Sequence, residues 1–107
     1  MNMQKLMKEA QQAQRKMQEA QERIVATTIE GSAGGGMVNV TATGDGTITK
    51  VQIEPSAINT EEIELLEDLI MAAVNDVQNK SKELQESEMG SAMGGLGSGM
   101  GGLGGLF

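Results

Sequence analysis

Apolar residues at the start of the chain recur at alternating steps of three and four, and this periodicity constrains the fold more than any other feature. The series runs through Met3, Leu6, Ala10, Ala13, Met17, Ala20 and Ile24. Such spacing places the side chains along one stripe of a helix and is typical of a helix packed lengthwise against a second helix. Because residues 2–24 contain neither Gly nor Pro, the helix is expected to be continuous. Its partner helix belongs either to the same chain or to another copy, and the pattern leaves both open.

The middle of the chain changes to an alternation of apolar and polar residues, which is typical of β-strands. A first strand is predicted over residues 25–32, followed by a connection through Gly34-Gly35-Gly36. Two further strands, residues 37–43 and 48–53, flank Gly44-Asp45-Gly46, whose glycines suit the positive φ angles of a tight hairpin turn. One face of the first of these two strands is apolar, with Val38, Val40 and Ala42. In the other strand, the alternation separates Thr49, Val51 and Ile53 from Ile48, Lys50 and Gln52.

Helix-forming residues return over residues 59–88, where Asn59 and Glu62 are spaced as a capping box. The apolar positions of this helix form a broad band, made of Ile63, Leu65, Leu66, Leu69, Ile70, Ala72, Ala73 and Val77. One small sheet cannot cover so wide a band, so we expect a second subunit to bury the excess. The predicted fold class is therefore α+β in the order α-β-β-β-α. It comprises a three-stranded antiparallel sheet and two long terminal helices, assembled as a homodimer.

The composition changes again at residue 89. Residues 89–107 hold nine of the fifteen glycines and no charged residue. Glycine raises the conformational entropy that folding must overcome, and this segment has little contiguous apolar surface to offset that cost. We therefore predict a folded domain over residues 1–88 and a disordered, Gly/Met-rich tail over residues 89–107.

The charges are unevenly distributed along the chain. The net charge is −7, yet residues 1–26 carry +2 and residues 51–88 carry −8. The first helix rises about 34 Å, whereas a strand of seven residues spans about 23 Å, so part of this helix should project beyond the sheet. Its basic residues fall within about 100° of the helical wheel, away from the apolar stripe. They are Lys5, Lys8, Arg15, Lys16 and Arg23.

A basic stripe on a projecting helix suits the phosphate backbone of duplex DNA, and these five residues are the predicted DNA-binding residues. The alternative is a solvated face that keeps the helix soluble through mixed charge. Single-strand recognition by base stacking is not expected, because the only aromatic residue is Phe107.

The residue types that are missing argue against an enzyme. The chain has no Cys and no His, so the usual ligands of zinc and the commonest acid–base catalyst are absent. Gly34-Gly35-Gly36 is not followed by the Lys-Ser/Thr of a phosphate-binding loop. We expect no cofactor, no metal and no small-molecule substrate. The longest apolar run, residues 69–74, is too short to span a membrane, and the predicted location is the cytoplasm.

Several segments together resemble the YbaB/EbfC family of bacterial nucleoid-associated proteins. The resemblance is carried by Met3-Gln4-Lys5-Leu6-Met7-Lys8-Glu9-Ala10, by Gly34-Gly35-Gly36-Met37-Val38, by Ile53-Glu54-Pro55-Ser56 and by the run LEDLIMAAVND over residues 66–76. The Gly/Met-rich end is similar too, so that the resemblance covers essentially the whole chain.

The resemblance implies a tweezer-shaped homodimer that binds duplex DNA in the nucleoid and affects nucleoid organisation and gene expression. A second function stays open. The acidic helix, the apolar stripe of the first helix or the tail would then hold a protein partner, in recombination, replication or protein targeting. In that case the protein is a non-enzymatic adaptor.

Overall fold

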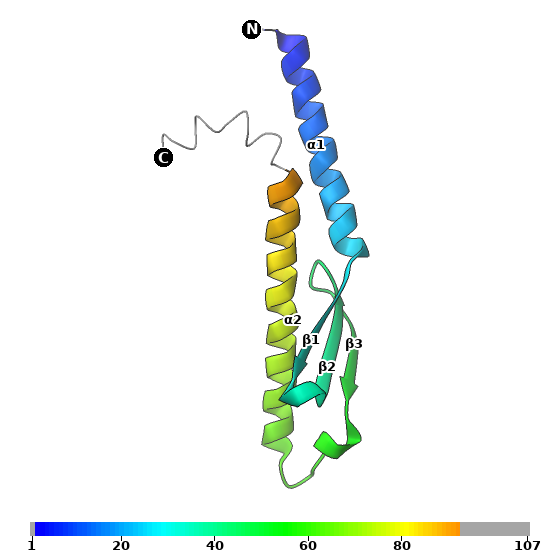
Figure 1. The fold of residues 1–107 in the computed structure, drawn as a ribbon, viewed down its shortest axis with the longest axis vertical. Helices are drawn as coiled ribbons and strands as arrows, with labels where there is room; N and C mark the ends of the chain where they lie inside the picture. Colours follow the sequence, from blue (N-terminus) through cyan, green and yellow to red (C-terminus); the bar gives the residue numbers. More distant parts are fainter. Residues whose placement is uncertain (1, 93–107) are drawn as a thin grey trace, which may run out of the picture.

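The computed structural model describes residues 2–92 and has the predicted element order (Figure 1). Helix α1 (Met3–Ala26) leads into strand β1 (Thr28–Ala33), the short 3-10 helix η1 (Gly34–Gly36) and strands β2 (Val38–Thr43) and β3 (Ile48–Ile53). A second 3-10 helix, η2 (Pro55–Ala57), precedes helix α2 (Ile63–Ala92). The predicted α+β class and the α-β-β-β-α order are confirmed. The molecule is elongated, with extents of 71 × 28 × 16 Å.

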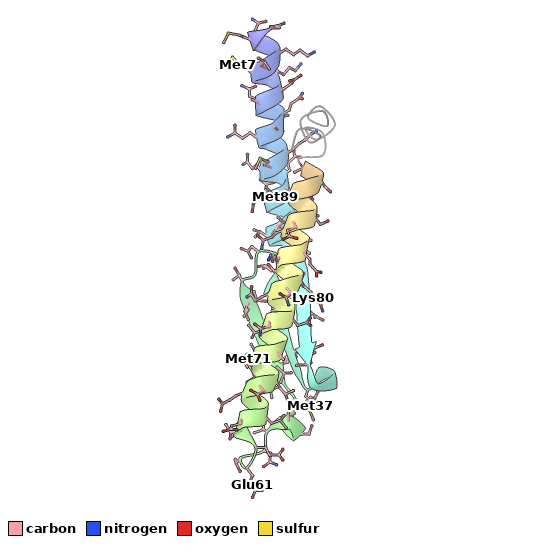
Figure 2. All side chains as sticks on the ribbon, turned by 90° about the vertical axis from the view of Figure 1, so that its left-hand side faces the viewer. Met7, Met37, Glu61, Met71, Lys80 and Met89 are labelled. Atoms are coloured by element: carbon pink, nitrogen blue, oxygen red, sulfur yellow. The ribbon has the colours of Figure 1, made fainter. Side chains whose placement is uncertain are left out.

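The three strands form one antiparallel sheet in the order β1-β2-β3, and α2 lies across one of its faces (Figure 2). The core forms where β2 meets α2: Val38, Val40 and Ala42 are fully buried against Ala73 and Val77. Residues directly opposite each other in the sheet share a face. The register therefore adds Ile29, Gly31 and Ala33 of β1 to the covered face, because they lie opposite Ala42, Val40 and Val38.

Helices α1 and α2 run antiparallel and pack along only part of their lengths (Figure 1). Ala20 and Ile24 of α1 are fully buried. Near them, Arg23 Nε donates to Glu88 Oε2 at 2.9 Å, and Gln21 Nε2 lies 3.8 Å from Met89 Sδ. The C-terminal part of the apolar stripe therefore packs on the chain's own second helix. The remainder of α1 extends past the end of α2, as the length of the helix predicts.

Two boundaries differ from the prediction. Val25 and Ala26, assigned above to the first strand, form the end of α1, and β1 begins at Thr28. Burial of Ile24 against the rest of the molecule favours helix there over the strand propensity of Val25. The predicted capping box does not start α2, since Asn59 Oδ1 accepts from the Glu61 N–H in a turn that precedes Ile63.

The β2–β3 hairpin differs from the predicted geometry in two respects. Of the two glycines in this turn, Gly44 and Gly46, only Gly46 has a positive φ angle, of 91°. Position 44 requires glycine for a steric reason, because a Cβ there would lie 2.2 Å from the Ile24 carbonyl oxygen. An irregularity in the pairing brings Ile48 opposite Ala42 although Lys50 lies opposite Thr41. The prediction that separated Ile48 from Val51 was therefore wrong, and both belong to the face that carries the core.

Helix α2 extends through Ala92 and so includes four residues of the segment for which disorder is predicted. Met89 and Ala92 lie in this last turn, and Ala92 is buried. The predicted disorder of residues 93–107 lies outside the described residues.

Candidate nucleic-acid interface

The predicted DNA-binding residues all lie on α1, and four of them lie on its projecting part. Asn2 caps the helix, its Oδ1 accepting from the Gln4 N–H at 3.0 Å. Because Gln21 already lies beside Met89, α2 ends at Ala92 at about the level of Gln18. The four basic residues beyond that level, all exposed, are Lys5, Lys8, Arg15 and Lys16.

Arg23 has a different environment from the other four. Its half-exposed side chain pairs with Glu88 and so helps to join α1 to α2. Among the described residues, the other ion pair joins Lys80 to Asp76, so the four basic side chains of the projecting part have no carboxylate within pairing distance there. A phosphate that contacted Arg23 would compete with Glu88. Phosphates that contacted the other four would not break an ion pair seen in residues 2–92.

The projecting part of α1 is also favourable to anions as a whole. Residues 2–18 contain four basic residues and one acidic residue, Glu9. The first turn has no acidic residue, so the positive end of the helix dipole adds to the positive charge of the side chains. An anion would therefore meet positive potential along this part of the helix.

Acidic residues are concentrated at the opposite end of the long axis, although others lie along α2. Six of them are exposed around η2 and the start of α2: Glu54, Glu61, Glu62, Glu64, Glu67 and Asp68. Figure 2 shows Met7 near one end of the molecule and Glu61 at the other, along an axis of 71 Å. Screening reduces interactions between exposed charges beyond about 8 Å at physiological salt. The acidic end therefore does not oppose anion binding at the N-terminal end of α1.

A second unusual surface lies along β3, at the edge of the sheet that α2 leaves uncovered. Val51 is 48% exposed and Ile48 is 40% exposed, although both share the face of the buried core. At the β1 edge, by contrast, side chains of α2 satisfy the backbone. Asp76 Oδ2 accepts from the Ser32 N–H at 3.0 Å, and Lys80 Nζ donates to the Glu30 carbonyl at 2.8 Å.

Two carboxyl groups, those of Asp45 and Asp76, have lowered pKa values, and each accepts hydrogen bonds that hold the fold together. Hydrogen bonds from the Thr43 hydroxyl and the Thr47 backbone lower the pKa of Asp45, which closes the hairpin turn. The Ser32 N–H, followed by Lys80, lowers the pKa of Asp76 at the β1 edge. The two groups lie on different elements and form no acid–base pair. Residues 2–92 contain no cluster of residues able to hold a metal ion, and no helix among them is long and apolar enough to cross a membrane.

Sequence reasoning missed the residues that bind the β1 edge. Both residues enter the charge analysis only through the net charge of −8 over residues 51–88, which does not distinguish them from the other charged residues of the helix. Their spacing of four residues is the signal that was available, since it places both on one side of a helix. The need for glycine at position 31 left no local signal, because it arises from contact with a helix more than forty residues away.

Comparisons with known proteins identify the family of this chain. A model of the YbaB/EbfC DNA-binding family matches residues 1–96. A relative from Desulfotalea psychrophila, described as a nucleoid-associated protein, is 46% identical over 96 residues, which cover 90% of this chain and 91% of the relative. One from Ruminiclostridium cellulolyticum, described in the same way, is 44% identical over 95 residues, covering 89% of this chain and 83% of the relative.

A solved structure has a similar fold. The crystal structure of the uncharacterized protein HP0035 from Helicobacter pylori is similar with a TM-score of 0.69 and 25% identity, covering 90% of this chain and 98% of that one. The family match spans both helices and the whole sheet. The chain therefore belongs to the YbaB/EbfC DNA-binding family.

Proposed function

We propose that this protein binds duplex DNA in the bacterial nucleoid as a homodimer and thereby affects nucleoid organisation and gene expression. The observation that carries the proposal is the projecting, basic N-terminal part of α1, held far from the acidic end of the molecule. Family membership supports the same ligand. The relatives' description as nucleoid-associated proteins supports the location.

The proposed contacts are to phosphates. Lys5, Lys8, Arg15 and Lys16 are exposed along one helix, and long basic side chains on such a surface attract a polyanion without reading its bases. Arg23 is the fifth proposed contact, made at the expense of its pair with Glu88. The described residues include no aromatic side chain on which an unpaired base would stack.

The homodimer is proposed to form along β3. An edge strand with unpaired backbone groups beside exposed apolar side chains favours pairing with another chain. Val51 and Ile48 meet this description, and the β1 edge does not. Two copies joined there would present two α1 helices to one duplex, in the tweezer shape that the family resemblance implies. Two such arms would raise the affinity through multivalency.

The decisive experiment is a gel-shift titration of the full chain with duplex DNA at several salt concentrations. The logarithm of the affinity should fall with the logarithm of salt by about 0.9 for each phosphate contacted. In the double variant Lys5→Ala/Lys8→Ala, we expect about tenfold weaker binding and a salt slope smaller by about one for each lost contact.

The matched control is Asn79→Asp/Lys82→Ala, which makes the same change in net charge at two exposed positions of α2, away from the N-terminal part of α1 and from β3. Its affinity should stay within about twofold of the wild type, because it removes no proposed phosphate contact. Equal losses in the two double variants, or a salt slope near zero, would refute the proposed interface.

A protein-adaptor role is a second candidate, favoured by the acidic end of the molecule. There Ile58 and Leu65 are exposed among acidic side chains, a composition that suits a partner with a basic rim around an apolar centre. Leu65→Ser would distinguish the two functions. If it abolishes capture of a purified partner and leaves duplex binding unchanged, the acidic end has a role of its own.

A further inference from the structure

The N-terminal half of the apolar stripe on α1 has no partner among residues 2–92. Met3 is 74% exposed, Met7 61% and Leu6 46%, whereas Ala20 and Ile24 farther along the same helix are fully buried. Figure 1 shows the reason, since α1 continues well past the end of α2. The apolar positions of this part of the helix are called the open stripe: the exposed Met3, Leu6, Met7 and Ala10 and the half-buried Ala13.

The end of α2 leads directly to the open stripe. Arg23 lies beside Glu88 and Gln21 beside Met89, so facing residues have numbers that add to about 110 in this antiparallel pair. A chain that continued along α1 in the same register would bring residue 93 beside Met17, residue 100 beside Ala10 and residue 107 beside Met3. Even at the short helical rise, residues 93–107 would reach about 22 Å, enough to follow α1 from Met17 to Met3.

The sequence of residues 93–107 matches the open stripe in spacing and in size. Apolar residues recur there at steps of three and four, through Met93, Leu96, Met100, Leu103 and Phe107. In the register above, the large Leu96 and Met100 come beside the small Ala13 and Ala10. Large residues opposite small ones allow close helix packing. The segment contains no charged side chain, so apolar contacts rather than side-chain ion pairs would hold it on α1.

We propose that residues 93–107 bind along the open stripe of α1 in their own chain. The tether makes this segment the favoured occupant, because it begins beside the stripe and so has a high effective concentration there. A second copy of α1 would need its own stripe to be free and would receive no such advantage. The glycines between the apolar residues weaken any intrinsic order, so contact with α1 must hold the segment in place.

The binding would leave the proposed DNA interface accessible. The basic residues lie on the side of α1 away from the stripe, so a bound segment covers apolar surface without covering Lys5 or Lys8. It would also support the projecting part of α1, which has no other partner in residues 2–92. The inference does not depend on DNA binding.

The test uses the absence of cysteine in the chain. A nitroxide label on Gln4→Cys in the full-length protein should increase the relaxation of backbone amide signals in residues 100–107. A label on Thr60→Cys, at the acidic end, should not. Ala10→Glu places a charge in the open stripe and should reduce the effect of the Gln4 label at least about threefold. Gln12→Glu makes the same charge change on the other side of the helix and should preserve it.

Two outcomes would overturn the proposal. One is equal relaxation of residues 100–107 in the Ala10→Glu and Gln12→Glu variants, which would mean that the stripe does not hold the segment. The other comes from mixing labelled protein with unlabelled, isotope-enriched protein. If the effect arises only between molecules, the occupant is a second copy.

Discussion

The two edges of the sheet differ in how far helix α2 covers them. At the β1 edge, α2 lies so close that Asp76 and Lys80 reach the backbone of Ser32 and Glu30. At the β3 edge, Val51 and Ile48 stay half-exposed on the same face of the same sheet. The comparison shows that α2 lies off-centre, covering β1 and β2 and leaving most of the third strand uncovered.

Gly31 explains the direction of the displacement. A Cβ at this position would lie 2.5 Å from the Val77 backbone nitrogen and 2.7 Å from the Ala73 carbonyl oxygen. The backbone of α2 therefore rests directly on β1. A helix is about 10–12 Å wide with its side chains, and strands lie about 4.8 Å apart, so a helix seated on β1 extends over β2 and little farther. The missing side chain at Gly31 therefore helps to leave Val51 and Ile48 exposed on β3.

The largest expected effect comes from filling the close contact at the covered edge. Gly31→Ala should lower the free energy of unfolding by on the order of 3 kcal/mol, because backbone atoms on both sides cannot move aside easily. Urea denaturation followed by circular dichroism measures it. Gly90→Ala is the matched control, since a Cβ there meets nothing within 4 Å, and it should stabilise by about 0.5–1 kcal/mol. A mild effect of Gly31→Ala would show that α2 is not held against β1.

The next effect concerns the open edge. Val51→Asp should weaken self-association at least about a hundredfold, because two carboxylates would face each other in an apolar contact. Light scattering or sedimentation over a range of concentrations measures the oligomeric state. Gln52→Asp adds the same charge to the other face of the same strand and should leave the association within about threefold of the wild type. A Val51→Asp protein that associates as well as the Gln52→Asp protein would exclude the β3 face as the interface.

The smallest expected effect concerns the hydrogen bond from the Ser32 N–H to Asp76 at the β1 edge, and it is measured as the dependence of stability on pH. The Ser32 N–H stabilises the ionised form of Asp76 and lowers its pKa below 3.8. The contribution of ionised Asp76 to the free energy of unfolding is therefore present above pH 3.8 and is lost as the pH falls through the lowered pKa. Asp76→Asn should lower the urea midpoint modestly at pH 7 and lose less on acidification than the wild type.

The control for this change is Asp68→Asn, which removes an exposed carboxylate from the same helix. It makes the same change in net charge and should keep the acid sensitivity of the wild type. Some acid sensitivity should remain in Asp76→Asn as well, because hydrogen bonds also lower the pKa of Asp45 in the hairpin turn. Identical acid profiles for Asp76→Asn and the wild type would mean that the contact with Ser32 does not stabilise the fold.

Features with a local cause could be predicted well. The 3-4 spacing from Met3 to Ile24 predicted α1, and the alternation from Val38 to Ala42 predicted the buried face of β2. Both patterns depend on the period of a single element. Boundaries set by neighbours were predicted less well, as at Val25, where the strand propensity was outweighed by packing of the helix end. The face of Ile48 was missed because a pairing irregularity between strands leaves no trace in the alternation of one strand.

In the candidate site, too, some features depend on the local sequence and others on tertiary contacts. The sequence by itself determined which residues carry the positive charge and that they occupy one side of a helix, because charge and helical period are properties of the local chain. Only the tertiary structure decided that Arg23 pairs with Glu88, that Asp76 and Lys80 hold the β1 edge, and that β3 stays open. These outcomes depend on where α2 comes to rest, and steric contact at Gly31 determines that position between residues far apart in the chain.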